Sequence, residues 1–365
     1  MSRLKVLSVL AIGLLLAVPV FASTVAVGTC KPSLVSFTTI SAAVSSVPSG
    51  STVEVCPGTY AEQVTIAQPL TLKGISSGNA GQAIVAVPGS GLTVVTSGSG
   101  NNIAPLVHVT AGPVNISDIT VDGTGSNITS FPPWIAGILF DTGSSGTVNE
   151  ITARNLAGNG AGVGVWAENA SGPNESVTIE NSSFHDIDDS AIITLGGSGL
   201  LLATAKGNTM QAAGFQVQWF SSGSLTANVI SGGFEGVRVG GAVAVSGNTL
   251  DSQSIGIAAF GAVAATSNKI SNASSFGIDD FGGAATYKGN TITKAGIGIE
   301  FNCEATPPTA TSNTINDATT GLDSVPSSFS GANSFNNVVT LRTDGCGFKP
   351  TPQAPSGPMR APAQQ

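Results

Sequence analysis

The chain of 365 residues carries a net charge of −8, and only 9% of its residues are charged while 41% are apolar. This sparse and acidic charge leaves no basic stripe for phosphate backbones, which excludes nucleic acid as a partner. With 47 glycines and 5% aromatic residues, the core must be built from small aliphatic side chains between close turns.

The first segment has the pattern of a targeting signal. Arg3 and Lys5 precede an apolar run from Val6 to Val18, and small residues follow up to Ala22. This pattern predicts a secretory signal peptide over residues 1–22, cleaved after Ala22. The run is too short for a membrane anchor. We therefore expect a secreted protein, extracellular or periplasmic, with no membrane insertion after cleavage.

Four cysteines remain in the expected mature chain, as two separated pairs. An oxidising compartment favours disulfides, and no two cysteines have the close spacing of a zinc site. We therefore predict the bridges Cys30–Cys56 and Cys303–Cys346, one at each end of the fold, in preference to a metal site.

Both ends of the mature chain differ from its middle. Residues 37–44 place apolar side chains at helical spacing and lead to Pro48, which predicts a short amphipathic helix closing the N-terminal end of the core. Residues 349–365 are rich in Pro, Ala and Gln without apolar periodicity, which predicts a disordered tail. The folded domain is expected to span residues 23–348.

A recurring asparagine dominates the middle of the chain. Each copy is followed by small polar residues, then a glycine and usually a short apolar run; the asparagines are Asn208, Asn228, Asn248, Asn268, Asn290 and Asn313, and the glycines are Gly214, Gly236, Gly256, Gly277, Gly296 and Gly321. Gaps of 20, 20, 20, 22 and 23 residues are typical of a solenoid of stacked coils. We predict an all-β solenoid from about residue 50 to 345, with roughly a dozen coils and a length of about 60 Å.

The recurring asparagines suit the tight bends between strands, because asparagine tolerates left-handed backbone and bonds its own neighbourhood. On stacked coils their amides can pair from one coil to the next and form a ladder. We therefore assign them to the scaffold and not to catalysis.

The segment from Phe37 to Ile66, followed by Leu70 to Gly74, resembles the first coils of the pectin-lyase-like right-handed parallel β-helix superfamily. Pectin methylesterases and NosD-like periplasmic proteins share this opening, and the repeat after Asn208 is similar to the generic parallel β-helix repeat. The resemblance implies a single-stranded right-handed parallel β-helix. It implies no single activity, because the superfamily includes lyases, hydrolases, esterases, epimerases and proteins that are not enzymes.

The catalytic motifs of that superfamily are incomplete here. Asp279-Asp280-Phe281-Gly282-Gly283 is the nearest match to the methylesterase aspartate motif, and Asp188-Asp189 resembles the paired aspartates of polygalacturonase-like hydrolases. The other esterase and hydrolase elements and the D-P-H-D segment of alginate epimerases are absent. Elimination of the pectate-lyase type needs only a base, usually Arg or Lys, and a cation such as calcium that neutralises the substrate carboxylate.

Counting two and four residues from each repeat glycine predicts one outward-facing strip. Amides bond hydroxyl groups, rings stack on sugars and arginine grips carboxylates. Arg238 is the candidate base or uronate clamp; the predicted substrate-binding residues are Trp166, Gln216, Gln218, Phe260, Phe281 and Glu300. The alternative is an ordinary solvated surface in which Arg238 pairs with Glu235 or reaches toward Asp279.

Acidic residues supply the other candidates for chemistry. Alternation places Asp280 toward the core, and because a buried unpaired carboxylate is unfavourable we expect a bulge at Asp279–Asp280 that turns one acid outward. His185, Asp186, Asp188 and Asp189 form the densest titratable patch, which suits calcium, a proton-transfer pair or a solvated turn. The predicted catalytic residues are Arg238, Asp279, Asp280, Asp188 and Asp189, and calcium is the cofactor that such a site would take.

These patterns predict a secreted, monomeric β-helix protein that binds polysaccharide along one outer face. Cleavage, by pectate-lyase-like elimination or by glycoside hydrolysis, would require Arg238 and the acids to converge. The alternative is a non-catalytic recognition rod at the cell surface or in the periplasm, or a NosD-like accessory protein, since a binding surface needs only rings and amides.

Overall fold

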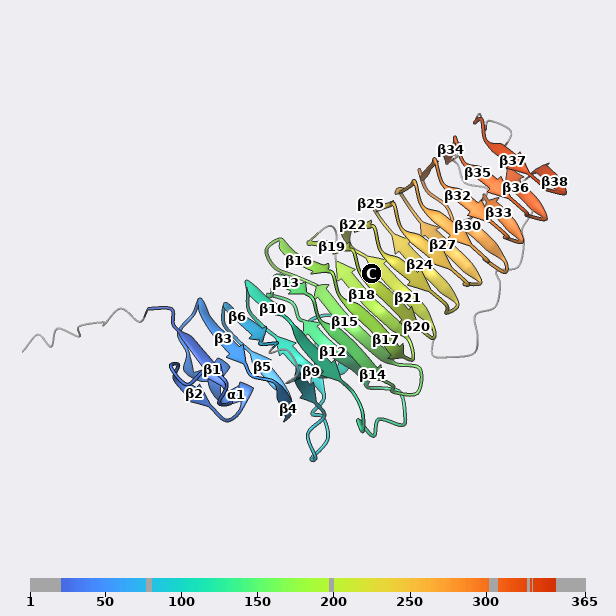
Figure 1. Ribbon diagram of the computed structural model, residues 1–365. Helices are drawn as coiled ribbons and strands as arrows, with labels where there is room; N and C mark the ends of the chain where they lie inside the picture. The colour runs from blue at the N-terminus through green and yellow to red at the C-terminus, as the bar shows by residue number, and fades with distance from the viewer. Residues whose placement is uncertain are drawn as a thin grey trace, which may run out of the picture.

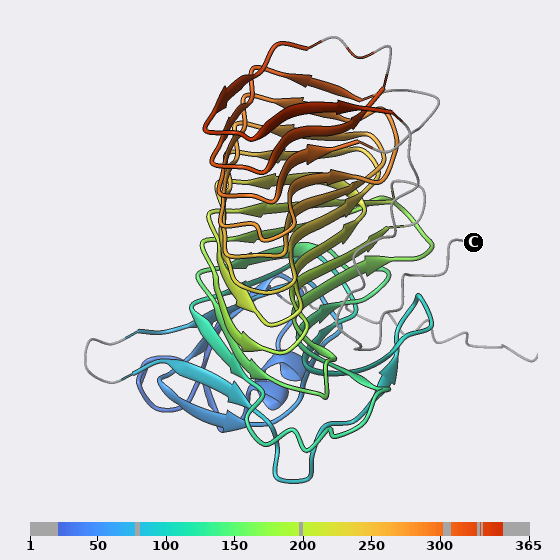
Figure 2. The same cartoon turned by 90° about the vertical axis from the view of Figure 1, so that its right-hand side faces the viewer.

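The computed structural model describes residues 21–76, 81–196, 200–301, 308–326, 329 and 331–345. Over these residues three parallel sheets wrap around one apolar core, and the coils stack into a long rod (Figures 1 and 2). Each complete coil gives one strand to sheet A, then one to sheet B and one to sheet C. Sheet B has 12 strands in the described part of the chain, in agreement with the predicted dozen coils.

The strands are grouped here by sheet, in chain order. Sheet A consists of β1 (Thr24–Val27), β2 (Ser36–Phe37), β3 (Ser51–Val55), β6 (Leu70–Gly74), β10 (Val114–Ser117), β13 (Gly146–Asn149), β16 (Glu175–Glu180), β19 (Leu201–Lys206), β22 (Ser222–Thr226), β25 (Val243–Ser246), β28 (Val263–Thr266), β31 (Thr286–Lys288) and β34 (Thr309–Thr311). Sheet B consists of β4 (Gly58–Ala61), β7 (Ala83–Ala86), β11 (Ile119–Asp122), β14 (Thr152–Leu156), β17 (Ser183–Ile187), β20 (Thr209–Ala212), β23 (Val229–Ser231), β26 (Thr249–Asp251), β29 (Lys269–Ser271), β32 (Thr291–Thr293), β35 (Thr314–Asn316) and β37 (Ser334–Asn336). Sheet C consists of β5 (Val64–Ile66), β9 (Asn102–Val109), β12 (Trp134–Phe140), β15 (Gly162–Asn169), β18 (Ser190–Gly196), β21 (Phe215–Phe220), β24 (Glu235–Gly240), β27 (Ile255–Phe260), β30 (Phe276–Asp280), β33 (Ile297–Glu300), β36 (Thr320–Val325) and β38 (Thr340–Asp344), with β8 (Val95–Thr96) antiparallel to β9.

The core consists of aliphatic side chains that repeat at the same place in successive coils. Val53, Leu72 and Ile116 are register partners on neighbouring strands of sheet A, and each is at most 1% exposed. Because side chains alternate between the two faces of a strand, a shift of one residue would move such a column into solvent. The register is therefore set by apolar burial.

The recurring asparagines form a continuous buried ladder. From Asn208 onward, each asparagine donates its backbone N–H and its Nδ2 to the Oδ1 of the next, as at Asn248 and Asn268, where both distances are 3.0 Å. Each Nδ2 also donates to a backbone carbonyl, which for Asn248 is that of Leu225 at 3.0 Å. The ladder extends beyond the predicted set to Asn333. The scaffold role is confirmed.

The N-terminal end is closed by helix α1 (Ile40–Ser46), which buries Ile40, Ala43 and Val44 against the core. Thr39 caps the helix, and the Glu62 carboxylate accepts hydrogen bonds from the N–H groups of Ile40 and Ser41 at 2.7 and 2.9 Å. A carboxylate suits this position because the first N–H groups of a helix lack partners within it.

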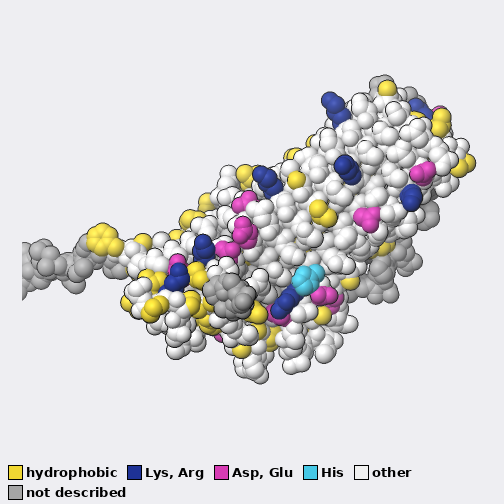
Figure 3. All heavy atoms as spheres, viewed as in Figure 1, with side chains coloured by type: hydrophobic (Ala, Val, Ile, Leu, Met, Phe, Trp, Pro, Cys, Tyr) yellow, Lys and Arg dark blue, Asp and Glu magenta, His cyan; other side chains and the backbone are white. Residues whose placement is uncertain are grey.

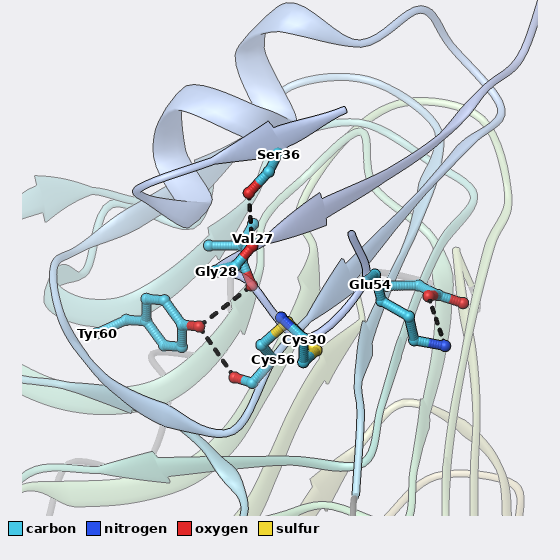
Figure 4. Close-up of a disulfide and its surroundings, with 8 residues drawn as sticks. Val27, Gly28, Cys30, Ser36, Glu54, Cys56 and Tyr60 are labelled. Atoms are coloured by element: carbon cyan, nitrogen blue, oxygen red, sulfur yellow. Dashed lines mark hydrogen bonds and ion pairs between the residues drawn. A yellow bond between two sulfur atoms is a disulfide. The ribbon is translucent and has the colours of Figure 1, made fainter. Parts of the chain in front are cut away.

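The predicted Cys30–Cys56 disulfide is present beside the first strands of sheet A (Figure 4). Tyr60 lies next to it and donates its hydroxyl to the carbonyl of Cys56 at 2.9 Å. Cys303 and Cys346 lie outside the described residues, as do residues 1–20 of the predicted signal peptide and the whole of the predicted tail. No helix in the described part of the chain is long and apolar enough to cross a membrane.

Candidate functional site

A glycine near the start of each later strand of sheet C decides which side chains face outward. A Cβ atom on Gly236 would lie 2.7 Å from the Leu250 side chain in the core, and the next residue, Val237, is also a core residue. Two successive positions thus point inward. As a result the flanking residues, Glu235 and Arg238, share the outer side of the strand and contact each other.

The register of sheet C defines an outer column of side chains along the rod. Its members, each paired with the next on the adjacent strand, are Trp166, Ile193, Gln218, Arg238, Ala258, Asp279 and Glu300. Five of the seven were predicted site residues, and this column brings them onto one face. Asp189 and Phe260 lie beside it.

The prediction that Gln216 faces outward is wrong. Gln216 occupies the position that is glycine in the next coils, and its side chain is fully buried. Its amide accepts from the Ala212 N–H at 2.7 Å and donates to the carbonyls of Ala212 and Gly232 at 2.6 and 3.0 Å. Counting from Gly214 introduced the error, because Gly214 lies two residues before the true repeat position.

Trp166 is also not on the surface, contrary to the prediction. It is 2% exposed and lies in a second apolar cluster outside sheet C, with its ring 5.4 Å from that of Trp134. Its Nε1 donates to Glu168, and Glu168 in turn accepts from the backbone N–H and the hydroxyl of Ser99 at 2.8 and 2.6 Å. The segment between β8 and β9 is thereby fastened over this part of the face.

Arg238 is held rigidly at the centre of the outer column. Its Nε and Nη2 donate to the two carboxylate oxygens of Glu235 at 2.7 and 2.8 Å, and its guanidinium lies 4.5 Å from the Phe215 ring centre and 5.5 Å from that of Phe260. This is the pairing with Glu235 that the sequence left as an alternative. Because a guanidinium carries only N–H donors, Arg238 acts as a hydrogen-bond donor toward Glu235.

A polar group next to Arg238 consists of Gln218, Ser190 and Asp189. The Gln218 Nε2 donates to Ser190 Oγ at 2.9 Å and to Asp189 Oδ2 at 3.2 Å, and Ser190 Oγ donates to the same carboxylate at 2.9 Å. Burial raises the pKa of Asp189 to about 7, against these hydrogen bonds and the charge of Arg238, which lower it. Asp189 is thus near its titration point at neutral pH.

Asp188 builds the neighbouring loop. Its carboxylate accepts from the backbone N–H groups of Gly158, Gly160 and Gly162 at 2.8, 2.8 and 2.5 Å. His185 and Asp186, predicted to lie with it in one patch, instead occupy the outer face of sheet B on β17. The patch is therefore divided between two faces.

Asp279 and Asp280 point to opposite sides of β30, and the expected bulge between them is absent. They pair with Ala258 and Ala259 without a shift of register, so Asp280 enters the core, where it is 1% exposed beside Tyr287. The Gly282 N–H donates to Asp280 at 3.1 Å. On the outer side, burial raises the pKa of Asp279 to about 7, and Glu300, Glu235 and Asp280 add to the shift.

Phe260 and Phe281 stack on each other at the edge of the outer column. Their ring centres are 4.3 Å apart at an angle of 6°, and Phe260 is 37% exposed. Each ring covers one face of the other. Phe215, Ser190 and Glu235 belong to the same surface and were not predicted as site residues. Glu235 could have been found from the sequence, because Gly236 and Val237 both point inward and the residues on either side of them must point outward.

Metal binding at the predicted acids finds no support in the geometry. Within the described residues, no three His, Cys, Asp or Glu side chains converge closely enough to hold an ion. Two cavities lie away from sheet C, one of about 220 Å³ near Gln82 and Thr152, the other of about 470 Å³ beside residues 123–128.

Comparison with known proteins identifies the fold. No family model matches the sequence, and no curated protein matches it. Among solved structures, the Azotobacter vinelandii mannuronan C-5 epimerase AlgE4 A-module is similar, with a TM-score of 0.56 and 16% identity over 80% of this chain and 89% of that one. The chain is a right-handed parallel β-helix.

Two further structures share the β-helix fold. The surface adhesin PfbA of Streptococcus pneumoniae is similar with a TM-score of 0.52 and 14% identity, over 85% of this chain and 89% of that one. The tailspike protein gp49 of Acinetobacter baumannii bacteriophage Fri1, a capsular polysaccharide depolymerase, has a TM-score of 0.53 and 12% identity, over 81% of this chain and 58% of that one. At these identities the likeness is one of fold.

Proposed function

We propose that this β-helix is an exported protein that binds a neutral polysaccharide along the outer face of sheet C. Two proteins of similar fold act on polysaccharides by name, the mannuronan epimerase and the capsular depolymerase, which supports a polysaccharide as the ligand. The Cys30–Cys56 disulfide supports export to an oxidising compartment. The observation that carries the proposal is the fixed arrangement of Arg238 between two phenylalanine rings.

The binding groups lie on three successive strands along the axis of the rod, with Phe260 two residues to the side of the outer column. Gln218 and Arg238 are register partners on adjacent strands, and Phe260 lies one strand further. Neighbouring strands are about 4.8 Å apart, so a polymer lying along the axis meets an amide, a guanidinium and an aromatic edge in turn. Side chains already held by Glu235 and Ser190 lose little conformational entropy on binding.

The charge of this surface favours a neutral sugar over a uronate. Glu235 neutralises Arg238 through both oxygens, and Asp189, Asp279 and Glu300 lie on the same face. A substrate carboxylate would meet more negative than positive groups. We therefore propose that the remaining N–H groups of Arg238 bind sugar hydroxyls and not the carboxylate of a uronate.

The test measures affinity for a panel of neutral and acidic polysaccharides by calorimetry and affinity electrophoresis. The double variant Glu235→Gln with Arg238→Met removes the charge pair without leaving a buried carboxylate alone, and Phe260→Ala removes the exposed ring. We expect each to weaken binding of the neutral polymer about tenfold or more. Lys269→Ala and Leu202→Ala, which alter exposed residues on sheets B and A, should leave it unchanged. Binding of acidic polymers alone, or equal losses in the controls, would refute the proposal.

A second candidate function is glycoside hydrolysis with Asp279 as the general acid. Asp279 and Glu300 are register partners on adjacent strands, and the pKa of Asp279 is raised to about 7. Glycosidases use such pairs of acids, in which each carboxyl group has a different role. Asp189 cannot be its partner, because four coil steps of about 4.8 Å separate their strands by roughly 19 Å.

The same polysaccharide panel tests this candidate. New reducing ends that disappear with Asp279→Asn, and that decline as the pH rises through about 7, would show hydrolysis, because the acid must be protonated. Unsaturated products would indicate elimination instead. Binding without any product would leave the recognition rod as the function.

A further inference from the structure

A second column of polar side chains crosses the outer face of sheet B and takes no part in the surface described above. Asp122, Arg154, His185 and Gln211 are register partners on four consecutive strands, β11, β14, β17 and β20. Figure 3 shows a histidine grouped with basic and acidic side chains at the surface over β14 and β17. The column adjoins the larger of the two cavities, because Asn155 and Asp186, the chain neighbours of Arg154 and His185, line it.

The cavity has a volume of about 470 Å³ and is lined by residues 123–128, Asn155, Ala157 and Asp186. The segment 123–128 follows β11 directly. Asp122 fixes its start, because its carboxylate accepts from the N–H and the hydroxyl of Thr124 at 3.0 and 2.6 Å. Ser126 Oγ donates to the Ala157 carbonyl at 3.2 Å, and both residues line the cavity. The volume falls in the range of about 300–1,000 Å³ usual for small-molecule sites.

Asp122 holds Arg154 in place and leaves the terminal nitrogens of Arg154 able to donate hydrogen bonds. It accepts from Arg154 Nε at 2.9 Å and from Asn155 Nδ2 at 3.0 Å. Although burial raises it, the pKa of Asp122 is lowered to about 2 overall by hydrogen bonds from Thr124, Asn155 and Arg154. The terminal nitrogens of Arg154 make no hydrogen bond within the described part of the chain, and the side chain is 35% exposed. They are donors available to a ligand.

Asp186 supplies acceptors and is paired with His185. His185 Nδ1 lies 2.6 Å from Asp186 Oδ2, and because a carboxylate only accepts, Nδ1 is the donor of this pair. Asp186 sits at a register shift with a φ of 56°, which turns its side chain outward so that it is 68% exposed and lines the cavity. A bulge commonly re-aims a side chain in this way.

The balance of these groups decides the class of ligand. The two carboxylates of Asp122 and Asp186 outweigh the one guanidinium of Arg154, which disfavours an anion. Asp186 lines the cavity and offers acceptors, and Arg154, the chain neighbour of the lining residue Asn155, offers donors. A hydroxyl group can both donate and accept, so a polyol matches this pattern. We propose that the cavity beside Arg154, His185 and Asp186 binds one neutral sugar residue, independently of the sheet C surface.

The experiment titrates neutral monosaccharides against the purified mature protein, followed by saturation-transfer NMR and calorimetry, with glucuronate and sulfate as anionic probes. Asp186→Gly removes the central acceptor and accepts the left-handed backbone without strain. We expect the affinity for the bound sugar to fall about tenfold or more, while Asp317→Gly, an exposed aspartate at φ 52° far from the cavity, changes nothing.

Variants at the two sites distinguish this cavity from the surface on sheet C. The Glu235→Gln and Arg238→Met double variant should keep monosaccharide binding here even if polymer binding is lost. His185→Ala and Arg154→Met should weaken the same sugar. No binding of any neutral sugar at millimolar concentration, equal loss in Asp186→Gly and Asp317→Gly, or a preference for glucuronate or sulfate would each overturn the proposal.

Discussion

Two buried carboxyl groups on the outer face of sheet C have strongly raised pKa values. Asp189 and Asp279 both have pKa values raised to about 7, with burial as the first cause. By contrast, hydrogen bonds from Ser271, Asn272 and Ser252 lower the pKa of Asp251, which is only partly buried. The same side-chain type is thus protonated or ionised at neutral pH according to its surroundings.

The raised pKa of Asp189 predicts a dependence of stability on pH. Between its unfolded value near 3.8 and its folded value of about 7, the folded state binds more protons than the unfolded state. The free energy of unfolding therefore falls as the pH rises from about 4 to 7, by a few kcal/mol as an order of magnitude. We expect Asp189→Asn to flatten this fall and to be more stable than the parent at pH 8, in urea unfolding at pH 5, 6, 7 and 8.

Asp251→Asn serves as the control for that series. Its folded pKa is lowered, so its contribution is present at neutral pH and is lost only as the solution becomes acidic. The variant should lose a little stability at pH 8 and keep the slope between pH 5 and 8. An unchanged slope in Asp189→Asn would show that burial of this carboxyl does not control the titration.

At the scale of elements, the outer sides of β9, β12, β15 and β18 build a second apolar cluster. The two tryptophans Trp134 and Trp166 lie in it, and Glu168, fully buried, joins Trp166 Nε1 to the segment between β8 and β9. Such a buried carboxylate is stabilising only while all its donors remain paired with it. The outer face is consequently closed toward the N-terminus and accessible around Arg238.

Glu168→Ala should release this segment. Each donor left unpaired costs about 1–3 kcal/mol, so we expect a clear drop in the unfolding midpoint, a red shift of tryptophan fluorescence and faster proteolysis within residues 97–101. Glu54→Ala breaks only a surface pair with Lys31 at 3.2 Å and should cost less than about 1 kcal/mol. Equal effects of the two changes would contradict the prediction that Glu168 holds the segment between β8 and β9 against sheet C.

At the scale of the whole molecule, each strand of the three sheets pairs only with strands of the neighbouring coils. Stability in such a solenoid is a sum of coil and interface contributions. The asparagine ladder joins the later coils to one another, while the disulfide Cys30–Cys56 and helix α1 close the first ones. The two ends are thus stabilised by different means.

Removing the disulfide should therefore act locally. Cys30 and Cys56 are 26 residues apart, a loop whose cross-link contributes about 3 kcal/mol in the chain-entropy model. In Cys30→Ser with Cys56→Ser, hydrogen exchange should accelerate in β1 to β4 and stay unchanged in the ladder between Asn228 and Asn290. Asn268→Ala should show the reverse pattern, and uniform exchange in both would refute local coupling.

The sequence by itself determined the solenoid, the asparagine ladder, the N-terminal helix and the Cys30–Cys56 bridge, because each depends on a local or strictly periodic pattern. Register across coils needed the tertiary structure. The sequence places Gln216 on the wrong side of its strand, since an irregular coil shifts the count by two residues. The expected bulge at Asp279–Asp280 is absent, because the core accepts the polar side chain of Asp280 where it finds partners. Loops cover some outer positions, such as that of Trp166. The sequence could not predict this, because the packing of these loops follows no repeat.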